Sequence, residues 1–352
     1  MLVNIQALRA VAAFLVVFVH LGRLTELAGL PNGVTDFGNS GVDLFFVISG
    51  LIMVVTTSER SQTASHFLRH RIARIVPLYW VITVAVFALA LAAPALLQST
   101  RADPLELIKS LVFIPYQRFD GQMHPVVFVG WTLNYEMMFY AIFALGMLLP
   151  WRSLGLAFAL TVLGLASLAG QVFAPHAPLP AFYTSPIMLE FGAGMVLGVL
   201  LTRDLLPAAR APALVMGVVA FVLMLAGSWL WPTIDRSIMS GIPAFFIVGS
   251  ALMAERAGLA WKSGWIQLLG AASYSIYLTH FFATQAIVKL AERLDHPPPR
   301  RYRGVWACRA GAGRPGGRYG ASRYRVAPDR ARAPRTGRPT ATPAHRRPRG
   351  RA

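Results

Sequence analysis

The sequence predicts an all-α fold, a polytopic bundle of helices that crosses a membrane. Of its 352 residues, 55% are hydrophobic and only 14% are charged, whereas soluble domains carry about 25% charged residues. The mean hydropathy is +0.53. This composition argues against a soluble globular enzyme and excludes a disordered chain. Cys308 is the single cysteine of the sequence, so a disulfide scaffold is excluded as well.

Apolar stretches long enough to cross a bilayer recur through the first 296 residues, which we take as one membrane domain, 1–296. The first stretch is no typical signal peptide, because Arg9 interrupts it and no small-residue cleavage site follows. The longest gap, residues 99–125, has room only for a short amphipathic piece. We expect nine spans, at 5–23, 40–57, 75–98, 126–149, 153–173, 184–202, 211–230, 238–254 and 267–288.

The basic residues of the short loops predict the orientation of the chain in the membrane. Loop 58–74 holds Arg60, Arg69, Arg71 and Arg74, and it is cytoplasmic if the N-terminus is cytoplasmic. The loops on the other side offset their basic residues with acidic ones. We therefore predict a multi-pass protein with its N-terminus in the cytoplasm.

The basic character of the chain belongs to its tail. Residues 297–352 hold 16 Arg and one acid, so they carry most of the net charge of +18. Nine spans would place this tail outside, against the positive-inside tendency. We interpret the Arg/Pro/Gly-rich tail as disordered and as the product of a shifted reading frame. The alternative is a polybasic arm for anionic lipid or nucleic acid. We exclude the tail from the fold and predict no nucleic-acid partner.

Two ionisable residues lie within the first span, Arg9 and His20. Eleven residues apart on a helix, they differ by about 20° around the axis and lie roughly 16 Å apart along it. A lone His can be a satisfied core residue, and a lone Arg can extend to the lipid headgroups. One shared polar stripe on an apolar helix favours a working site instead.

Two acids are candidates for orienting the imidazole of His20. Asp43 lies near the outer end of the second span, at a depth that we expect to be similar to that of His20. Its alternative role is a helix N-cap. Glu136 is an acid inside the fourth span, with Thr132 and Asn134 as polar neighbours. The sequence does not choose between these two acids.

Arg71 and Arg74 are three residues apart, so on a helix they share a face at the predicted cytoplasmic boundary. Two guanidinium groups there can hold phosphates through several charge-assisted hydrogen bonds. The alternative is that these residues set topology and contact anionic lipids.

The last span carries a polar stripe with a three-residue spacing. Its hydroxyls suit either an acceptor site or hydrogen bonds between helices. No clustered spacing of His, Cys or Asp predicts a metal site. The stripe consists of Ser273, Tyr274, Tyr277 and His280.

Together, these segments resemble the family-3 membrane acyltransferases, which O-acylate bacterial surface carbohydrates. The resemblance covers about residues 1–290. In its short length the chain is similar to the branch of the family that acts in exopolysaccharide production. The resemblance rests on the Arg-x10-His spacing of Arg9 and His20, the FFVISG run Phe45–Gly50, Arg71 and Arg74 before Pro77–Trp80, the WTLNYE segment Trp131–Glu136, and the string Ser273–His280.

The resemblance implies an acyl-CoA donor, typically acetyl-CoA, and no permanently bound cofactor. It also implies a saccharide or lipid-linked saccharide acceptor at the outer side of a bacterial inner membrane. The family bundle has about ten helices, and here the basic tail takes the place of the last one.

Acyl transfer to a sugar hydroxyl needs a base, and His20 is our candidate because imidazole titrates near working pH. Asp43 or Glu136 would hold its tautomer. Arg71 and Arg74 would anchor the CoA phosphates, and Arg9 would neutralise donor charge.

A transporter of a polar or anionic solute is the alternative function. It predicts internal repeats or paired broken helices, and the sequence has no such symmetry. A lipid-linked glycosyltransferase would favour acidic ligands in large outer loops, which this chain lacks.

Overall fold

The computed structural model describes residues 2–31, 34–58, 62–94, 102–119, 121–230 and 234–294, and these residues form a helical bundle. Within these ranges there is no strand, only an isolated bridge between Gln117 and Met123. The helices are α1 Val3–Val19, α2 Gly22–Leu27, α3 Ser40–Thr56, α4 Ala64–Ala92, α5 Pro104–Leu111, α6 Trp131–Gly146, α7 Arg152–Phe173, α8 Pro178–Tyr183, α9 Leu189–Thr202, α10 Arg210–Leu230, α11 Ile242–Arg256, α12 Gly264–Ala271 and α13 Ser273–Leu294.

The all-helical prediction is confirmed for the described residues, and six helical stretches there are long and apolar enough to cross a membrane. The other three predicted spans are helical, but they do not meet that length and hydropathy. They correspond to α1, α6 and the pair α12–α13. The proposed disordered tail, 297–352, lies outside the described residues, as does the end of the predicted span 75–98.

Two predicted boundaries differ from the observed ones. Helix α4 begins at Ala64, where the Thr63 side chain accepts a hydrogen bond from the His66 N–H, and not near residue 75. The first turns of α4 are cationic and precede its apolar part, so hydropathy alone does not detect them. The predicted span 267–288 is divided at Ala272 into α12 and α13.

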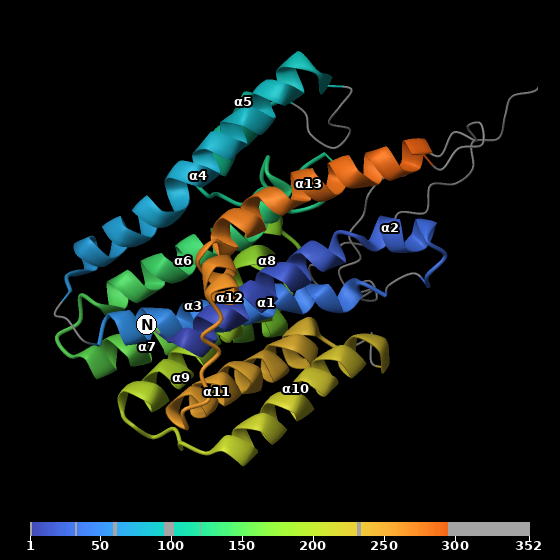
Figure 1. The fold of residues 1–352 in the computed structure, drawn as a ribbon. Coiled ribbons are helices and arrows are strands. Elements are labelled where there is room, and N and C mark those ends of the chain that lie inside the picture. The colour runs from blue at the N-terminus through green and yellow to red at the C-terminus, as the bar shows by residue number, and fades with distance from the viewer. Residues whose placement is uncertain are drawn as a thin grey trace, which may run out of the picture.

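Helices α1 and α3 occupy the middle of the bundle, with α10 and α11 along one edge and α4 and α5 along the opposite one (Figure 1). Helix α3 packs tightly on α9 because glycines let the two backbones approach. A side chain at Gly194 would collide with the Val47 carbonyl, and one at Gly50 with the Phe191 carbonyl.

The contact at Gly194 gives a stability prediction. We expect Gly194→Ala to lower the free energy of unfolding by about 1–3 kcal/mol, because the added methyl forces α3 and α9 apart. Gly164→Ala on α7 is the matched control, since a methyl there meets nothing within 4 Å. Detergent unfolding curves measure both variants. Equal midpoints for the two would contradict the close approach.

The start of α1 is held by a distant helix. The backbone N–H groups of Val3 and Asn4 donate to the Glu255 carboxylate on α11, at 2.8 and 2.7 Å. The Asn4 amide also donates to the Leu259 carbonyl at 2.7 Å and accepts from the Trp261 N–H at 2.8 Å. A carboxylate at a helix N-terminus satisfies free donors and complements the helix dipole.

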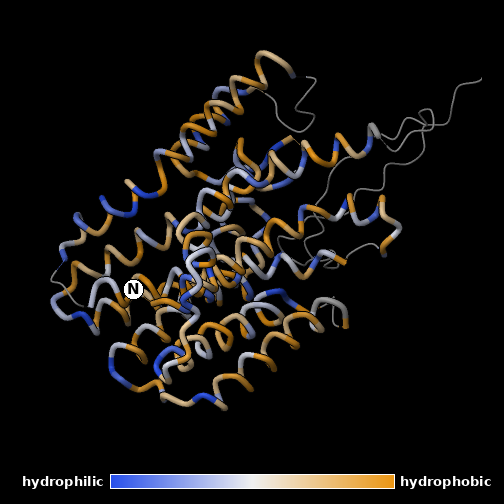
Figure 2. Tube along the Cα trace, viewed as in Figure 1, coloured by the Kyte–Doolittle hydropathy of each residue, from blue (hydrophilic) through white to orange (hydrophobic). Residues whose placement is uncertain are grey.

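The outer helices present apolar surface. In both α7 and α10, only 22% of the most apolar window is buried inside the protein. Most of the helical chain is hydrophobic in Figure 2, whereas hydrophilic residues gather in the first turns of α4 and in the loops. An exposed apolar surface of this extent fits contact with lipid chains.

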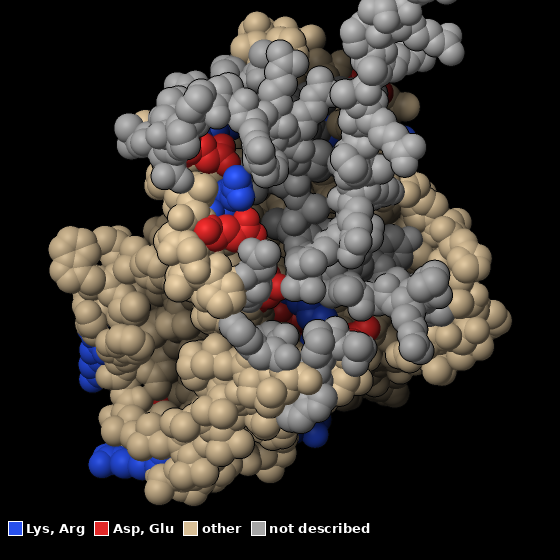
Figure 3. All heavy atoms as spheres, turned by 90° about the vertical axis from the view of Figure 1, so that its right-hand side faces the viewer, with Lys and Arg blue, Asp and Glu red and all other residues tan. Residues whose placement is uncertain are grey.

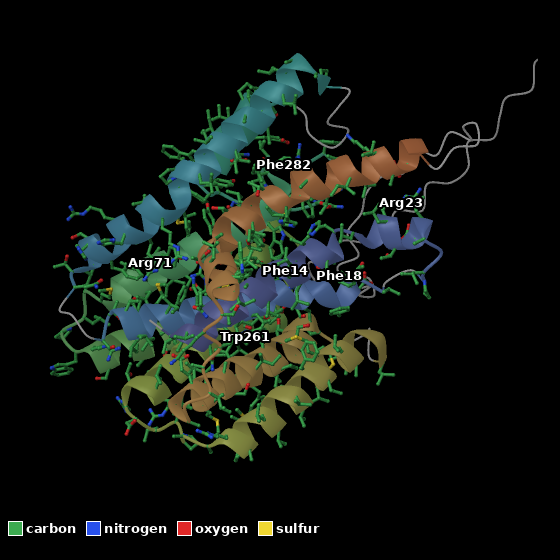
Figure 4. The ribbon with its side chains drawn as sticks, in the orientation of Figure 1. Phe14, Phe18, Arg23, Arg71, Trp261 and Phe282 are labelled. Atoms are coloured by element: carbon green, nitrogen blue, oxygen red, sulfur yellow. The ribbon has the colours of Figure 1, made fainter. Side chains whose placement is uncertain are left out.

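The two ends of the bundle carry different polar residues. Arg71 on α4 and Arg23 on α2 are at opposite ends (Figure 4). We call the end with Arg71 the arginine end. We call the other the histidine end, because His20 is three residues before Arg23. At the histidine end, Arg23 forms ion pairs with Glu26 and Glu292, at 3.2 and 3.1 Å. Figure 3 shows acidic and basic side chains side by side on this face.

Candidate active site

The polar stripes of α1 and α13 face each other. The Arg9 Nη2 donates to the Ser273 hydroxyl at 2.9 Å, and the His20 Nδ1 lies 3.3 Å from the His280 Nε2. Arg9 and His20 therefore share a face, as their spacing predicts. The structure brings the two histidines together from positions 260 residues apart.

The hydrogen bonds fix the tautomers of both neutral rings. The His280 Nδ1 lies 2.6 Å from the Tyr277 carbonyl oxygen, so it carries the proton and donates. The His20 Nδ1 lies 2.8 Å from the Val16 carbonyl oxygen and donates likewise. The single Nδ1–H of His20 is therefore shared between the Val16 carbonyl oxygen and, at 3.3 Å, the His280 Nε2, and the His20 Nε2 carries a lone pair. This nitrogen is buried, and its lone pair has no hydrogen-bond partner among the residues that the structure describes.

Asp43 contacts an arginine and not the imidazole of His20. Its fully buried carboxylate accepts hydrogen bonds from the Arg236 Nη2 and Nε, at 2.7 and 3.2 Å. Arg236 also donates to the Asn39 carbonyl at 2.8 Å, and Glu190 lies close enough to interact electrostatically with both members of the pair.

The position of Asp43 follows from the packing of α3 on α1. Gly41, two residues before it, packs against the Ala12 carbonyl and the Val16 side chain of α1. Asp43 is therefore held beside the part of α1 that precedes His20, where its carboxylate contacts Arg236. The register between α1 and α3 is set by glycine contacts, which distance along the sequence does not reveal.

Glu136 lies among hydroxyls and guanidinium groups. Its carboxylate accepts hydrogen bonds from Ser49 at 3.0 Å and from Tyr140. It also interacts electrostatically with Arg9 and Arg71. Among the described residues, neither Asp43 nor Glu136 contacts His20. The structure thus places His280 in the position expected for one of these acids.

Arg71 and Arg74 line a cavity of about 360 Å³ at the arginine end. The Arg71 guanidinium lies 5.4 Å from the centre of the Phe67 ring, and its Nη2 donates to the Thr56 hydroxyl at 3.1 Å. Arg74 also interacts electrostatically with Arg9. The other lining residues are Thr56, Gln62, His66, Phe67 and His70.

The remaining stripe residues bond to the helices around them. The Tyr277 hydroxyl lies 2.7 Å from the Thr132 hydroxyl and donates to the Val129 carbonyl at 3.1 Å. The Tyr274 hydroxyl donates to the Ile75 carbonyl at 2.7 Å. These contacts hold α13 against α4 and the start of α6, which places His280 beside His20.

Three contributors to the site were missed in the sequence analysis, Arg236, Ser49 and Tyr140. Arg236 lies just before an apolar span, and this position could have indicated a cation that reaches into the bundle. Ser49 lies within the FFVISG run, and Tyr140 follows Glu136 by one helical turn. That four-residue spacing is a detectable signal for a hydrogen bond on a helix.

The fold and the site together define a multi-pass membrane protein with a buried histidine pair near one end and clustered arginines near the other. This class includes enzymes that act across a bilayer. The chain belongs to an acyltransferase family. The model of this family, an acyltransferase domain, matches residues 2–307.

Curated relatives agree with this family. The chain is 38% identical over 261 residues to the exopolysaccharide production protein ExoZ of Rhizobium meliloti (strain 1021), covering 72% of this chain and 78% of that protein. It is 29% identical over 299 residues to the putative membrane-bound transacylase BcsY of Komagataeibacter xylinus, covering 79% and 72%. No solved structure matches. Family membership favours acyl transfer over solute transport.

Proposed function

We propose that this protein is a bacterial inner-membrane O-acyltransferase. It moves an acyl group, acetyl in our proposal, from acyl-CoA to a hydroxyl of a cell-surface or exopolysaccharide sugar. The single observation that carries the proposal is the unpartnered lone pair on the His20 Nε2, held in place by His280. The names of the two relatives, which refer to exopolysaccharide production and to a transacylase, support this choice.

The acyl-CoA donor binds at the arginine end, which is cytoplasmic in this proposal. Arg71 and Arg74 line its cavity and present guanidinium groups that suit the CoA phosphates. Arg9 lies next along the path and offsets the remaining negative charge of the donor. Glu136 holds these arginines in place electrostatically.

The thioester reaches His20 through the length of the pantetheine arm. Arg9 and His20 are about 16 Å apart along α1, and the stripe Ser273–His280 lies along the same path. Donor-binding arginines and a catalytic histidine can therefore work from different depths. The saccharide, free or lipid-linked, enters from the histidine end.

Direct transfer, which is simpler than a route through an acyl-histidine, is the scheme that we propose. The His20 Nε2 takes the proton of the sugar hydroxyl as its oxygen attacks the thioester carbonyl. The C–S bond then breaks, and the CoA sulfur leaves with the proton from His20. The Nδ1–H of the charged ring donates to the Val16 carbonyl and to His280 throughout, and these two acceptors stand where a carboxylate stands in other triads.

Acetyl-CoA binding to detergent-purified protein tests the donor assignment. We expect Arg71→Ala/Arg74→Ala to weaken binding by about 100-fold, because two charge-assisted contacts to phosphate are lost. Arg69→Ala is the matched control, since Arg69 lies on the same helix and does not line the cavity. Unchanged affinity in the double variant would contradict the assignment, and absence of binding by folded wild-type protein would contradict an acyl-CoA enzyme.

A further inference from the structure

Aromatic rings enclose His20 at the histidine end. Its imidazole makes edge-on contacts with Phe281, at 5.5 Å between ring centres and 89°, and with Phe128, at 6.2 Å and 79°. Phe128 and Phe281 stack on each other at 5.4 Å, and His124 lies 5.0 Å from Phe128. The rings come from three separate parts of the chain.

In this arrangement the base is closed off. The His20 Nε2 is buried and accepts no hydrogen bond. A sugar hydroxyl must come within about 3 Å of that nitrogen to give up its proton. One of the covering side chains therefore has to move before the acceptor reaches the base.

The two phenylalanines are suited to such a movement. Both are half-buried, and both contact the His20 ring. Phe128 lies in the short 3-10 turn Phe128–Gly130 between a loop and α6, and not within a long helix. By contrast, Tyr277 is fixed by hydrogen bonds from its hydroxyl.

We propose that Phe128 and Phe281 form a movable aromatic cover that keeps water away from the His20 Nε2 and yields to the acceptor sugar. Such a cover is needed because water can replace the sugar hydroxyl in the same chemistry. His20 would take a proton from water, the water oxygen would attack the thioester carbonyl, and free carboxylic acid and CoA would form. The apolar C–H faces of a sugar ring can pack on the same rings.

The inference rests on the proposed function, and acetyl-CoA alone is the probe that tests it. We expect Phe128→Ala and Phe281→Ala to release CoA without any acceptor at roughly ten times the wild-type rate. Phe282→Ala is the matched control, because this neighbouring ring of α13 (labelled in Figure 4) lies edge-on to Phe281 at 6.3 Å between ring centres and makes no ring contact with His20. It should hydrolyse acetyl-CoA like the wild type.

Two further variants separate the possible outcomes. Phe128→Leu keeps most of the apolar cover and should stay close to the wild-type rate, which shows whether a change in Phe128→Ala comes from lost cover. Adding His20→Ala to Phe128→Ala should return CoA release to the background. If wild-type protein binds acetyl-CoA but neither alanine variant hydrolyses it faster than the wild type, the proposal of an aromatic cover is wrong and the proposed function stands. If folded wild-type protein binds no acetyl-CoA, both are wrong.

Discussion

His20→Ala protein is expected to transfer acyl groups more slowly than the wild type by a factor on the order of 10³. The variant lacks the one nitrogen of the histidine pair that carries a free lone pair. Donor binding should change little, because the arginine cavity lies at the other end of the bundle. Transfer of radiolabelled acetyl groups in membranes, measured together with acetyl-CoA affinity, separates these two effects.

His280 provides the comparison for this experiment. His280→Ala leaves the lone pair of His20 in place and removes one of the two acceptors of its Nδ1–H, the Val16 carbonyl remaining, so we expect a smaller loss, about tenfold. The loss should be greatest at high pH if His280 stabilises the charged ring of His20, because at low pH the wild-type ring is protonated before that of the variant. His176→Ala changes an exposed histidine between α7 and α8, away from the arginine cavity, and should leave the transfer rate unchanged. A normal transfer rate in His20→Ala would remove His20 from the role of base.

Arg236→Met is expected to lower the free energy of unfolding by about 3 kcal/mol. The change leaves the carboxylate of Asp43 without a counter-charge where it is fully buried. We choose the lower end of the usual range because the Arg236 side chain is 30% exposed, so water offsets part of the loss. Unfolding in detergent, followed by circular dichroism, measures the effect.

A double variant shows whether the loss comes from the unpaired charge. Asp43→Asn/Arg236→Met removes both charges and should recover much of the stability lost in Arg236→Met alone. If the double variant is as unstable as the single one, packing and not charge accounts for the loss. If Arg236→Met is as stable as the wild type, the buried ion pair contributes nothing to the fold.

Local patterns predicted the helices and the polar face of α1. The spacing of Arg9 and His20 is enough to place both on one side of a helix, and the structure shows both against α13. The first turns of α4 were not predicted, because they are cationic and the helix begins before its apolar span.

Contacts between helices were beyond the reach of the sequence. The partner of His20 lies on a helix 260 residues away, and periodicity carries no information about which helices are neighbours. The depth of Asp43 depends on the contact of Gly41 with the α1 backbone, so it follows from packing and not from the position of Asp43 in its own span. The acids were therefore identified as polar residues of the interior, whereas their partners were not.

The tie between the start of α1 and Glu255 has a consequence for the order of assembly during synthesis. The first helix to leave the ribosome has two N–H donors whose acceptor is made about 250 residues later. At bacterial rates of translation this delay is on the order of 10 to 50 seconds. For that time, α1 is in the membrane without the contacts of Arg9 and His20 to α13. Helix α1, although first in the chain, completes its contacts only after α11 and α13 have been made.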